Sequence, residues 1–381
     1  MSARLSRLSS LALPLLLASL NANAADSWQS MFSFNGFGTL GVVHSNNPDA
    51  DFVNTVFEAH GAGETTSWSP AVDSKLGLQA TATPTDKLKA VVQLLVEQKW
   101  NGTYAPTLEW ANLSYQVTPD FDVRAGRIVW PMFVRSESQN VGFANFSVRP
   151  SAELAAEMPN TNNDGLDVTY QLHLGKATHA LTVFGGQSEE HYGDYYDNTV
   201  LTVKKIIGVS DMIDWHGLTL HAAAMHMQYT FTAPGVAPEP VQLPIYSVGA
   251  AYDSSTWYGI GDAQLARDPY YGTMKSFSVQ GGRHFGSLSP YVGYSQFTQA
   301  TFGPGVPVPL QTPTQADRFL GLRWDVRSGV DLKFQFDSIK SGDVAGSFPI
   351  SLVFPNNAQL YSAFLNHPNA NVVSAVVDFV F

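Results

Sequence analysis

Residues 108–129 read LEWANLSYQVTPDFDVRAGRIV, two runs in which apolar and polar side chains alternate on either side of a turn at Pro119. Alternation with a period of two is typical of β-strands that have one apolar face and one wet face. A hairpin about this turn places apolar partners on one face, namely Leu113 with Ala125, Tyr115 with Val123 and Val117 with Phe121. The other face carries Asn112, Ser114, Gln116, Asp122, Arg124 and Gly126.

The segment that follows, residues 130–164, is too long for a simple turn. Connections of this length within a compact fold are usually functional. We interpret the hairpin as the wall of a pore and the connection as a segment that folds into it. The alternative is a surface lid with solvated charges. Residues 151–158 have the spacing of a short helical turn, and the charged side chains of the connection are Arg135, Glu137, Arg149, Glu153 and Glu157.

The N-terminus has the pattern of a secretory signal. Arg4 and Arg7 precede an apolar run over residues 11–20, and small residues follow at 22–24. This pattern predicts a cleaved signal over residues 1–24, because the apolar run is too short to span a membrane. A buried N-terminal helix is the alternative. The mature chain, residues 25–381, shows no linker or composition break and is predicted to be one domain.

Composition excludes several classes of protein. The 381 residues include no cysteine, so disulfides and thiolate metal sites are impossible. The net charge is −11, and removal of Arg4 and Arg7 leaves 19 basic and 32 acidic residues, or −13. Such an acidic exported chain lacks the basic surface of a nucleic-acid-binding protein. No later run of about 18 apolar residues exists, so a membrane location requires a closed barrel.

The rest of the chain repeats the strand pattern. We predict an all-β fold of sixteen antiparallel strands, with residues 108–117 and 121–129 as the fourth and fifth. The other strands are predicted at 32–43, 74–82, 88–98, 166–173, 179–185, 200–209, 218–232, 245–253, 256–266, 275–285, 290–301, 318–326, 330–339 and 371–381.

The spacing of these strands is typical of a transmembrane β-barrel. Connections after even-numbered strands are short and the others are longer or more variable, as in barrels with short periplasmic turns and long outer loops. In the last strand Val373, Ala375, Val377, Phe379 and Phe381 share one face, which fits an apolar outer surface ending in an aromatic girdle. A soluble β-sandwich is the alternative, but it would leave many polar inward positions unexplained.

The chain also resembles a known family. The predicted signal, sixteen strands, long third outer loop and C-terminal Phe381 are similar to the Gram-negative trimeric porins. The run LEWANLSYQVTPDFDVRAGRIVWPMF, within residues 108–150, resembles a subgroup of porin-like proteins. The resemblance implies a homotrimer whose third loop bends into the barrel and narrows it opposite a basic patch on the wall. The connection lacks that family's usual Pro-Glu-Phe-Gly-Gly motif.

Two patterns that suggest cofactors or metals do not fit this context. Residues 36–41, GFGTLG, match the dinucleotide fingerprint, but a polar loop follows instead of a helix. His221 and His226 are five residues apart and therefore point to opposite faces of a strand. There is no Gly-x-Ser-x-Gly elbow. We expect no cofactor, no metal site and no enzymatic activity.

Charged residues on the wet strand faces are the candidate pore-lining residues. Rows of opposed charge across a pore set its ion preference, whereas the simpler explanation is ordinary lumen polarity. Besides the charged residues of the connection, the candidates are Lys89, Glu97, Asp122, Arg124, Arg127, Arg323 and Lys333.

Arg127 is an exception among these candidates, because alternation places it on the apolar face. Glu109 is its diagonal neighbour on that face, so the hairpin predicts an ion pair at the rim or at a subunit interface. The alternative is a β-bulge that turns Arg127 inward.

These patterns predict an outer-membrane porin that passes small hydrophilic solutes and ions by passive diffusion, with a weak preference for cations. A substrate-specific channel for an organic acid, phosphate or sugar is the alternative within transport. A barrel enzyme or an adhesin is the alternative outside it.

Overall fold

The computed structural model describes residues 31–55, 58, 60–99, 101–155, 162–193, 199–232, 238–269, 272–299, 314–341, 352–353 and 369–381. The predicted signal peptide and Glu157 lie outside these residues. None of the helices in the described ranges is long and apolar enough to cross a membrane.

Sixteen long strands make up most of the described chain. They are β1 (Phe32–Ser45), β4 (Lys75–Thr85), β5 (Leu88–Glu97), β6 (Thr107–Thr118), β7 (Phe121–Val129), β8 (Asn162–Leu174), β9 (Ala177–Gly193), β10 (Thr199–Trp215), β11 (Leu218–Thr232), β12 (Val241–Asp253), β13 (Trp257–Asp268), β14 (Gly272–Arg283), β15 (Leu288–Gln299), β16 (Thr314–Arg327), β17 (Val330–Ser341) and β19 (Asn369–Val380). Short elements are β2 (Asp51–Phe52), β3 (Trp68–Ser69), β18 (Leu352–Val353), the 3-10 helices η1 (Ser136–Ser138) and η2 (Gly142–Ala144), and α2 (Ala152–Ala155).

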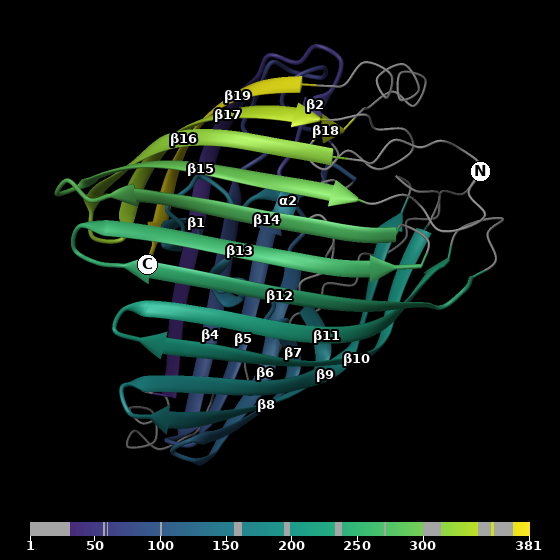
Figure 1. Cartoon of the computed structure of the whole chain (residues 1–381), viewed down its shortest axis with the longest axis vertical. Helices are drawn as coiled ribbons and strands as arrows, with labels where there is room; N and C mark the ends of the chain where they lie inside the picture. The colour runs from purple at the N-terminus through teal and green to yellow at the C-terminus, as the bar shows by residue number, and fades with distance from the viewer. Residues whose placement is uncertain are drawn as a thin grey trace, which may run out of the picture.

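The sixteen long strands close into one antiparallel barrel (Figure 1). Each pairs with its sequence neighbours, and closure comes from β1, which pairs with both β4 and β19. Seven connections of two to four residues gather at one end, on the left of Figure 1, which we call the short-turn end. The opposite, long-loop end includes the 32-residue connection 130–161. All sixteen predicted strands are confirmed, although several begin or end a few residues away from the prediction.

The pairing of β6 with β7 confirms the predicted hairpin register. Leu113 lies opposite Ala125, Ser114 opposite Arg124 and Tyr115 opposite Val123. The register shifts next to the turn, where Thr118 instead of Val117 pairs with Phe121. Val117 is therefore the extra residue of a β-bulge next to the turn, which moves the pairing by one residue.

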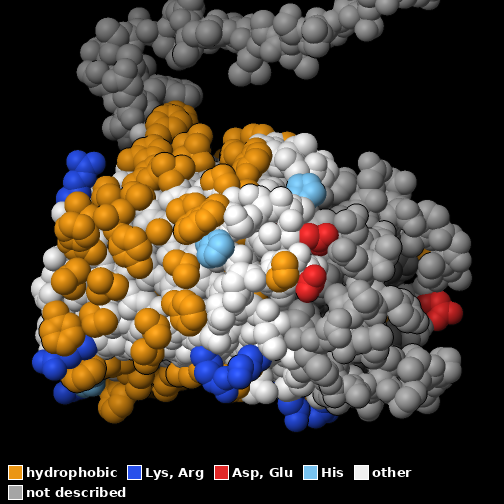
Figure 2. Space-filling view, turned by 90° about the horizontal axis from the view of Figure 1, so that it is seen from above, with side chains coloured by type: hydrophobic (Ala, Val, Ile, Leu, Met, Phe, Trp, Pro, Cys, Tyr) orange, Lys and Arg blue, Asp and Glu red, His pale blue; other side chains and the backbone are white. Residues whose placement is uncertain are grey.

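Apolar side chains cover the outer surface of the barrel. Figure 2 shows them spread over the short-turn end and the middle of one face. At the C-terminus the prediction is confirmed, because Val373 in β19 and Phe381 just after it are exposed while Ser374 and Asp378 are buried. This arrangement is typical of a strand with lipid on one side and a polar interior on the other.

Two glycines of the fingerprint-like run lie under aromatic rings of this outer surface. A Cβ atom on Gly36 would lie 2.3 Å from the ring of Phe381, and one on Gly38 would lie 2.5 Å from the ring of Phe379. Both glycines belong to β1. Because glycine has no side chain, the rings of Phe379 and Phe381 can pack directly against β1 where it pairs with β19 and closes the barrel.

The inner face is less polar than the alternation suggests. A cluster of buried apolar side chains, which we call the apolar sector, covers part of it near the long-loop end: Phe184, Leu201, Val203, Ile206, Ala223, Met225, Met227, Tyr229, Val241, Leu243, Ile245 and Ala266. These residues lie on β9 to β13. Trp130 and Met132, the start of connection 130–161, pack into the same cluster. The inner face of these strands is therefore apolar where the long connection packs against it, in contrast to the wet face predicted for the hairpin strands.

Candidate functional site

The long connection, residues 130–161, begins by attaching to the wall across the barrel from its own strand. His221 on β11 contacts the carbonyl oxygen of Pro131 at 3.0 Å, and Ser247 on β12 donates to the carbonyl oxygen of Met132. The backbone N–H of Val134 donates to Asp262 Oδ1 on β13 at 3.0 Å. Together with the apolar sector, these bonds fix the first residues of the long connection against β11 to β13.

The next turn of the long connection contacts β6 and β7. Glu137 in η1 forms an ion pair with Arg124 Nη1 at 2.8 Å, and Arg124 also contacts Asp167 on β8 at 2.7 Å. The side chain of Glu137 remains 58% exposed, in contrast to the other anchoring charges. Asn140 donates to Glu109 Oε1 at 3.3 Å. Arg124 therefore links the wall to the long connection at a solvent-accessible point.

Helix η2 lies against β1, β17 and β19. Lys333 on β17 is completely buried, and its ammonium group donates to the carbonyl oxygen of Gly142 at 2.7 Å and to Asp378 at 2.8 Å. Asp331 lies 3.7 Å away from the same ammonium group. A buried ammonium needs this set of acceptors, because an unpaired charge in the interior is costly.

A second cation on the same wall binds η2 and the residue that follows it. Arg323 on β16 donates from Nη1 to the carbonyl oxygens of Phe143 and Asn145, at 2.8 and 2.9 Å. Its other nitrogens contact Asp325 at 2.9 Å and Asp331 at 3.0 Å. Arg323 therefore binds the backbone of the long connection while its charge is balanced by carboxylates of the wall.

Arg149 ties the long connection to three other parts of the chain. It binds both oxygens of Asp73, at 2.8 and 2.7 Å, and contacts Asp337 on β17 at 3.4 Å and Ser374 on β19. Burial alone would lower the pKa of Arg149, but the charges of Asp73 and Asp337 outweigh it and raise that pKa above its ordinary value. Only 7% of the Arg149 side chain is exposed, so the ion pairs are desolvated and geometrically fixed.

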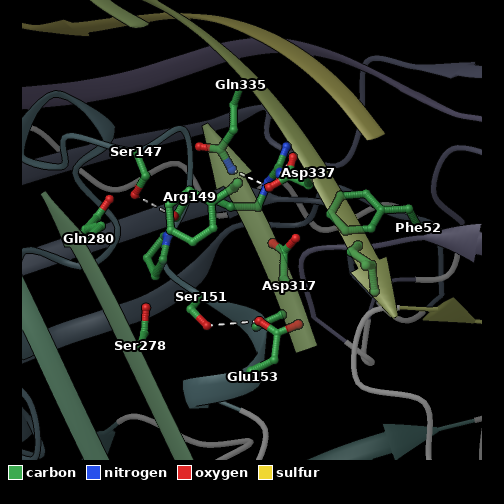
Figure 3. A pocket seen from close by; sticks show the side chains of 14 residues that line it. Phe52, Ser147, Arg149, Ser151, Glu153, Ser278, Gln280, Asp317, Gln335 and Asp337 are labelled. Atoms are coloured by element: carbon green, nitrogen blue, oxygen red, sulfur yellow. Dashed lines mark hydrogen bonds and ion pairs between the residues drawn. The ribbon is translucent and has the colours of Figure 1, made fainter. Parts of the chain in front are cut away.

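Helix α2 lies next to the part of the wall formed by β13, β14, β15 and β16. Glu153 accepts hydrogen bonds from Ser295 on β15 at 2.7 Å and from Gln315 on β16 at 2.6 Å. A small cavity separates α2 from the wall, and its lining includes Arg149, Glu153, Ser278, Gln280, Asp317 and Asp337. Figure 3 shows the carboxyl group of Asp317 pointing into the space between Arg149 and Glu153. The cavity therefore carries several carboxylates and one guanidinium.

A glycine allows the close approach of η2 to the wall. A Cβ atom on Gly142 would lie 1.9 Å from Asp378 Oδ1 and 2.5 Å from Thr39 Oγ1. We expect Gly142→Ala to displace η2, weaken its bond to Lys333 and lower the free energy of unfolding by about 1–3 kcal/mol. Urea unfolding of the folded protein measures this loss. Gly261→Ala is the control, because a Cβ there meets nothing closer than 3.4 Å; equal losses in the two variants would contradict the steric explanation.

Arg127 does not line the pore, which corrects its inclusion among the pore-lining candidates. It pairs in register with Ala111 and Asp164 and lies on the outer face, as alternation predicts. Arg127 forms its ion pair with Asp164, at 2.8 Å. The predicted ion pair between Arg127 and Glu109 is therefore wrong. The register shift between β5 and β6 adds one residue at Glu109. That bulge turns Glu109 inward to contact Asn140, whereas Arg127 keeps its outward position.

The remaining candidates lie at different depths of the barrel. Lys89 and Asp122 are on inner positions near the short-turn end, opposite Ser114 and Gln116. Glu97 forms a 3.8 Å ion pair with Lys75 near the long-loop end.

Arg135 is a further candidate within the long connection. It lies over the ring of Phe146, 5.0 Å from its centroid, and donates to the carbonyl oxygen of Ala144. Burial lowers the pKa of Arg135 below its ordinary value. Its contacts are therefore within the long connection itself.

Several residues of the site were not among the sequence candidates. Asp73 and Asp262 contact the long connection, Asp167 contacts Arg124, and Asp317 lines the cavity beside α2. Asp167, Asp262 and Asp317 occupy inward positions of strands, so alternation alone could have placed them among the candidate pore-lining residues. Asp73 lies in the connection before β4, where no periodic signal exists.

Comparisons with known proteins agree with this architecture. No protein-family model matches the chain, and no curated protein matches it by sequence. Among solved structures, the outer membrane channel DcaP of Acinetobacter baumannii aligns with a TM-score of 0.58 and 11% identity, covering 93% of this chain and 98% of that one. OmpT of Vibrio cholerae gives 0.55 and 11%, covering 92% and 98%. An anion-selective porin from Comamonas acidovorans gives 0.54 and 14%, covering 92% and 100%.

The chain has the porin fold. The likeness extends over nearly the whole length of these outer-membrane proteins, whereas identity is too low to carry over individual residues. The resemblance of residues 108–133 to a particular porin-like subgroup stays a prediction.

Proposed function

We propose that this protein is an outer-membrane porin through which small hydrophilic solutes and ions diffuse passively. The proposal rests on two features: a closed barrel with an apolar outer surface, and an inner face whose polar and charged side chains bond to the long connection. A water-filled lumen, a size limit and an electrostatic bias are sufficient for this function, and no chemical turnover is involved. Export through a cleaved signal peptide and assembly into a homotrimer belong to the same proposal.

The long connection is the proposed constriction. Its described residues bond to inward side chains on β6, β7, β11, β12, β13, β15, β16, β17 and β19. Contacts on walls so far apart around the ring support a path of this segment through the interior. The open path then runs beside Glu137 and Arg124, the anchoring ion pair that remains most exposed.

The charges at the constriction favour cations. Arg149 faces Asp73, Asp337, Asp317 and Glu153; Lys333 and Arg323 face Asp325, Asp331 and Asp378; and Arg124 faces Asp167 and Glu137. Around Arg124, the most exposed of these clusters, two carboxylates face one cation. Excess negative charge along a narrow path attracts cations and repels anions.

Single-channel recording in a planar bilayer under a salt gradient tests the proposed function. We expect a small conductance, because the proposed constriction narrows the pore, and a reversal potential of the sign for cation preference. Three equal closing steps are the expected sign of a homotrimer. A correctly inserted barrel that carries no current would contradict the diffusion pathway, and a saturable current for one solute would favour the substrate-specific alternative.

Glu137 provides a direct test of the electrostatic bias. Glu137→Gln removes one exposed negative charge beside the proposed path, and we expect the cation-to-anion permeability ratio to fall about twofold, the scale of one unit charge several ångströms away in water. Reversal potentials measure this ratio. The control is Glu189→Gln, which removes the same charge from β9 away from the long connection. Equal shifts in both variants would place the selectivity elsewhere.

A further inference from the structure

One ionisable pair lies on the outer surface of the barrel, among apolar side chains. His179 on β9 contacts Asp211 on β10, with 2.9 Å between Nδ1 and Oδ2. The two residues before Asp211 show the direction of the alternation, since Ser210 is buried and Val209 is exposed. Asp211 therefore points outward, as Val209 does. His179 lies on the same face, because it is opposite Ile213, two residues after Asp211.

This His–Asp pair lies well inside the apolar band of the wall. The exposed ring of Trp215 is four residues from Asp211, at the short-turn end of β10. Four residues of a tilted strand span about 10 Å along the barrel axis, and the apolar band of such barrels is about 25 Å tall. The residues directly opposite Asp211 on the neighbouring strands are Leu181 and Ala222. In an isolated barrel, hydrocarbon would therefore surround the pair.

Lipid is an unfavourable neighbour for two ionisable groups at this depth. Charged side chains on the lipid face destabilise a barrel most near the middle of the bilayer, and ionisable residues within a membrane usually mark functional sites. The side chains of His179 and Asp211 remain 23% and 30% exposed, so the barrel itself does not cover them. Among the described residues, Asp211 is the only side chain that bonds to the imidazole of His179. Another protein surface is the better neighbour.

The His–Asp pair is complementary to itself, which identifies a second copy of this chain as that neighbour. A copy rotated about an axis along the membrane normal presents Asp211 to His179 of the first copy. Each copy then gives and receives the same contact, as rotational symmetry requires. The outward residues of β11 beside the pair are Ala222 and Ala224, and small residues let backbones within a membrane approach closely.

We propose that the outer face of β9 to β11, centred on His179 and Asp211, is the contact surface between copies of this chain. The inference rests on the proposed function, and it names the surface that holds the proposed homotrimer together. The strand β10 is the eighth of the sixteen long strands, so this face lies across the barrel from the seam of β1 and β19. Figure 1 shows β9 to β11 far from β19. An experiment can therefore distinguish the two faces.

Cysteine cross-linking locates the contact, because the native chain has no cysteine. Ala222→Cys places one thiol opposite Asp211. The control Leu40→Cys places one at an exposed position of the seam. Each purified variant is refolded into lipid vesicles and treated with a short bismaleimide. We expect the Ala222→Cys chain to shift from monomer to dimer mobility on a denaturing gel, and the Leu40→Cys chain to remain at monomer mobility.

Exchanging the two groups tests whether the His–Asp pair makes this contact. In the Ala222→Cys chain, His179→Asp brings carboxylates together, so we expect the cross-linked dimer to be lost. The exchange His179→Asp/Asp211→His presents complementary groups again and should restore the dimer. Heat-modifiable gel migration verifies that every variant is folded. A dimer that persists in the His179→Asp variant would show that the contact does not depend on the pair.

Two further results would overturn the inference. One is a monomer from Ala222→Cys, and the other is a dimer from Leu40→Cys in its place. The readout is separate from transport, because cross-linking needs no current. A barrel that conducts but does not cross-link through β9 to β11 keeps the porin function and loses this contact surface, whereas a cross-linked barrel without current does the reverse.

Discussion

Replacing Arg149 by glutamine is expected to lower the free energy of unfolding by about 3–5 kcal/mol, the usual cost of removing one partner from a buried ion pair. Asp73 and Asp337, each only 2% exposed, would lose their counter-charge. The long connection would also lose its bonds to β17, β19 and the connection before β4. We therefore expect the conductance to rise as the segment detaches from the wall.

Urea unfolding followed by tryptophan fluorescence and single-channel recording measure these two effects. Arg149→Lys keeps the charge but cannot bind both oxygens of Asp73, so we expect an intermediate loss of stability. Arg267→Gln, at an exposed outer position, is the matched control and should change stability by less than about 0.5 kcal/mol. An unchanged unfolding midpoint for Arg149→Gln would contradict this prediction, because it would show that Asp73 and Asp337 stay buried at no cost without the charge of the guanidinium.

Replacing Lys333 by methionine should destabilise the barrel to a similar extent, about 3–5 kcal/mol. The methionine fills nearly the same volume, so the effect isolates the charge. Asp331 and Asp378 are completely buried and share this ammonium group, and the carbonyl oxygen of Gly142 would lose its donor. Because η2 depends on that bond, the conductance should increase as well.

A double variant separates charge from packing at this position. Lys333→Met combined with Asp378→Asn removes both members of the closest pair, and we expect it to recover part of the lost stability. The interaction energy follows from the two single variants and the double variant in urea unfolding. If the double variant is less stable than Lys333→Met by the full effect of Asp378→Asn, the two groups are energetically independent and the ion-pair argument fails.

The fold could be predicted from the sequence because each strand carries its own signal. In the hairpin of β6 and β7, alternation between Leu113, Ser114 and Tyr115 determines both the faces and the pairing register, and the structure agrees except beside the turn, where Thr118 pairs with Phe121. A one-residue slip would exchange the lipid and lumen faces, so the pattern leaves a single solution. The terminal strand up to Phe381 follows the same rule.

Irregular backbone limited the prediction of the site. Alternation assigned Arg127 to the outer face correctly, but it also placed Glu109 there, because a bulge has no clear sequence signal. The partners of the long connection were not predictable either. Asp262 is 128 residues away from Val134 and Asp337 is 188 residues away from Arg149, and nothing in the local pattern of either residue specifies the other.

The sequence by itself determined an all-β barrel of sixteen strands, the faces of those strands and the existence of a long charged connection, since these properties depend on local periodicity and on turn residues. Only the tertiary structure decided which charges meet, that part of the inner wall is apolar, and that Arg127 pairs with Asp164. The physical reason is that closing the barrel brings distant strands around one interior, where burial forces each charge to find a partner.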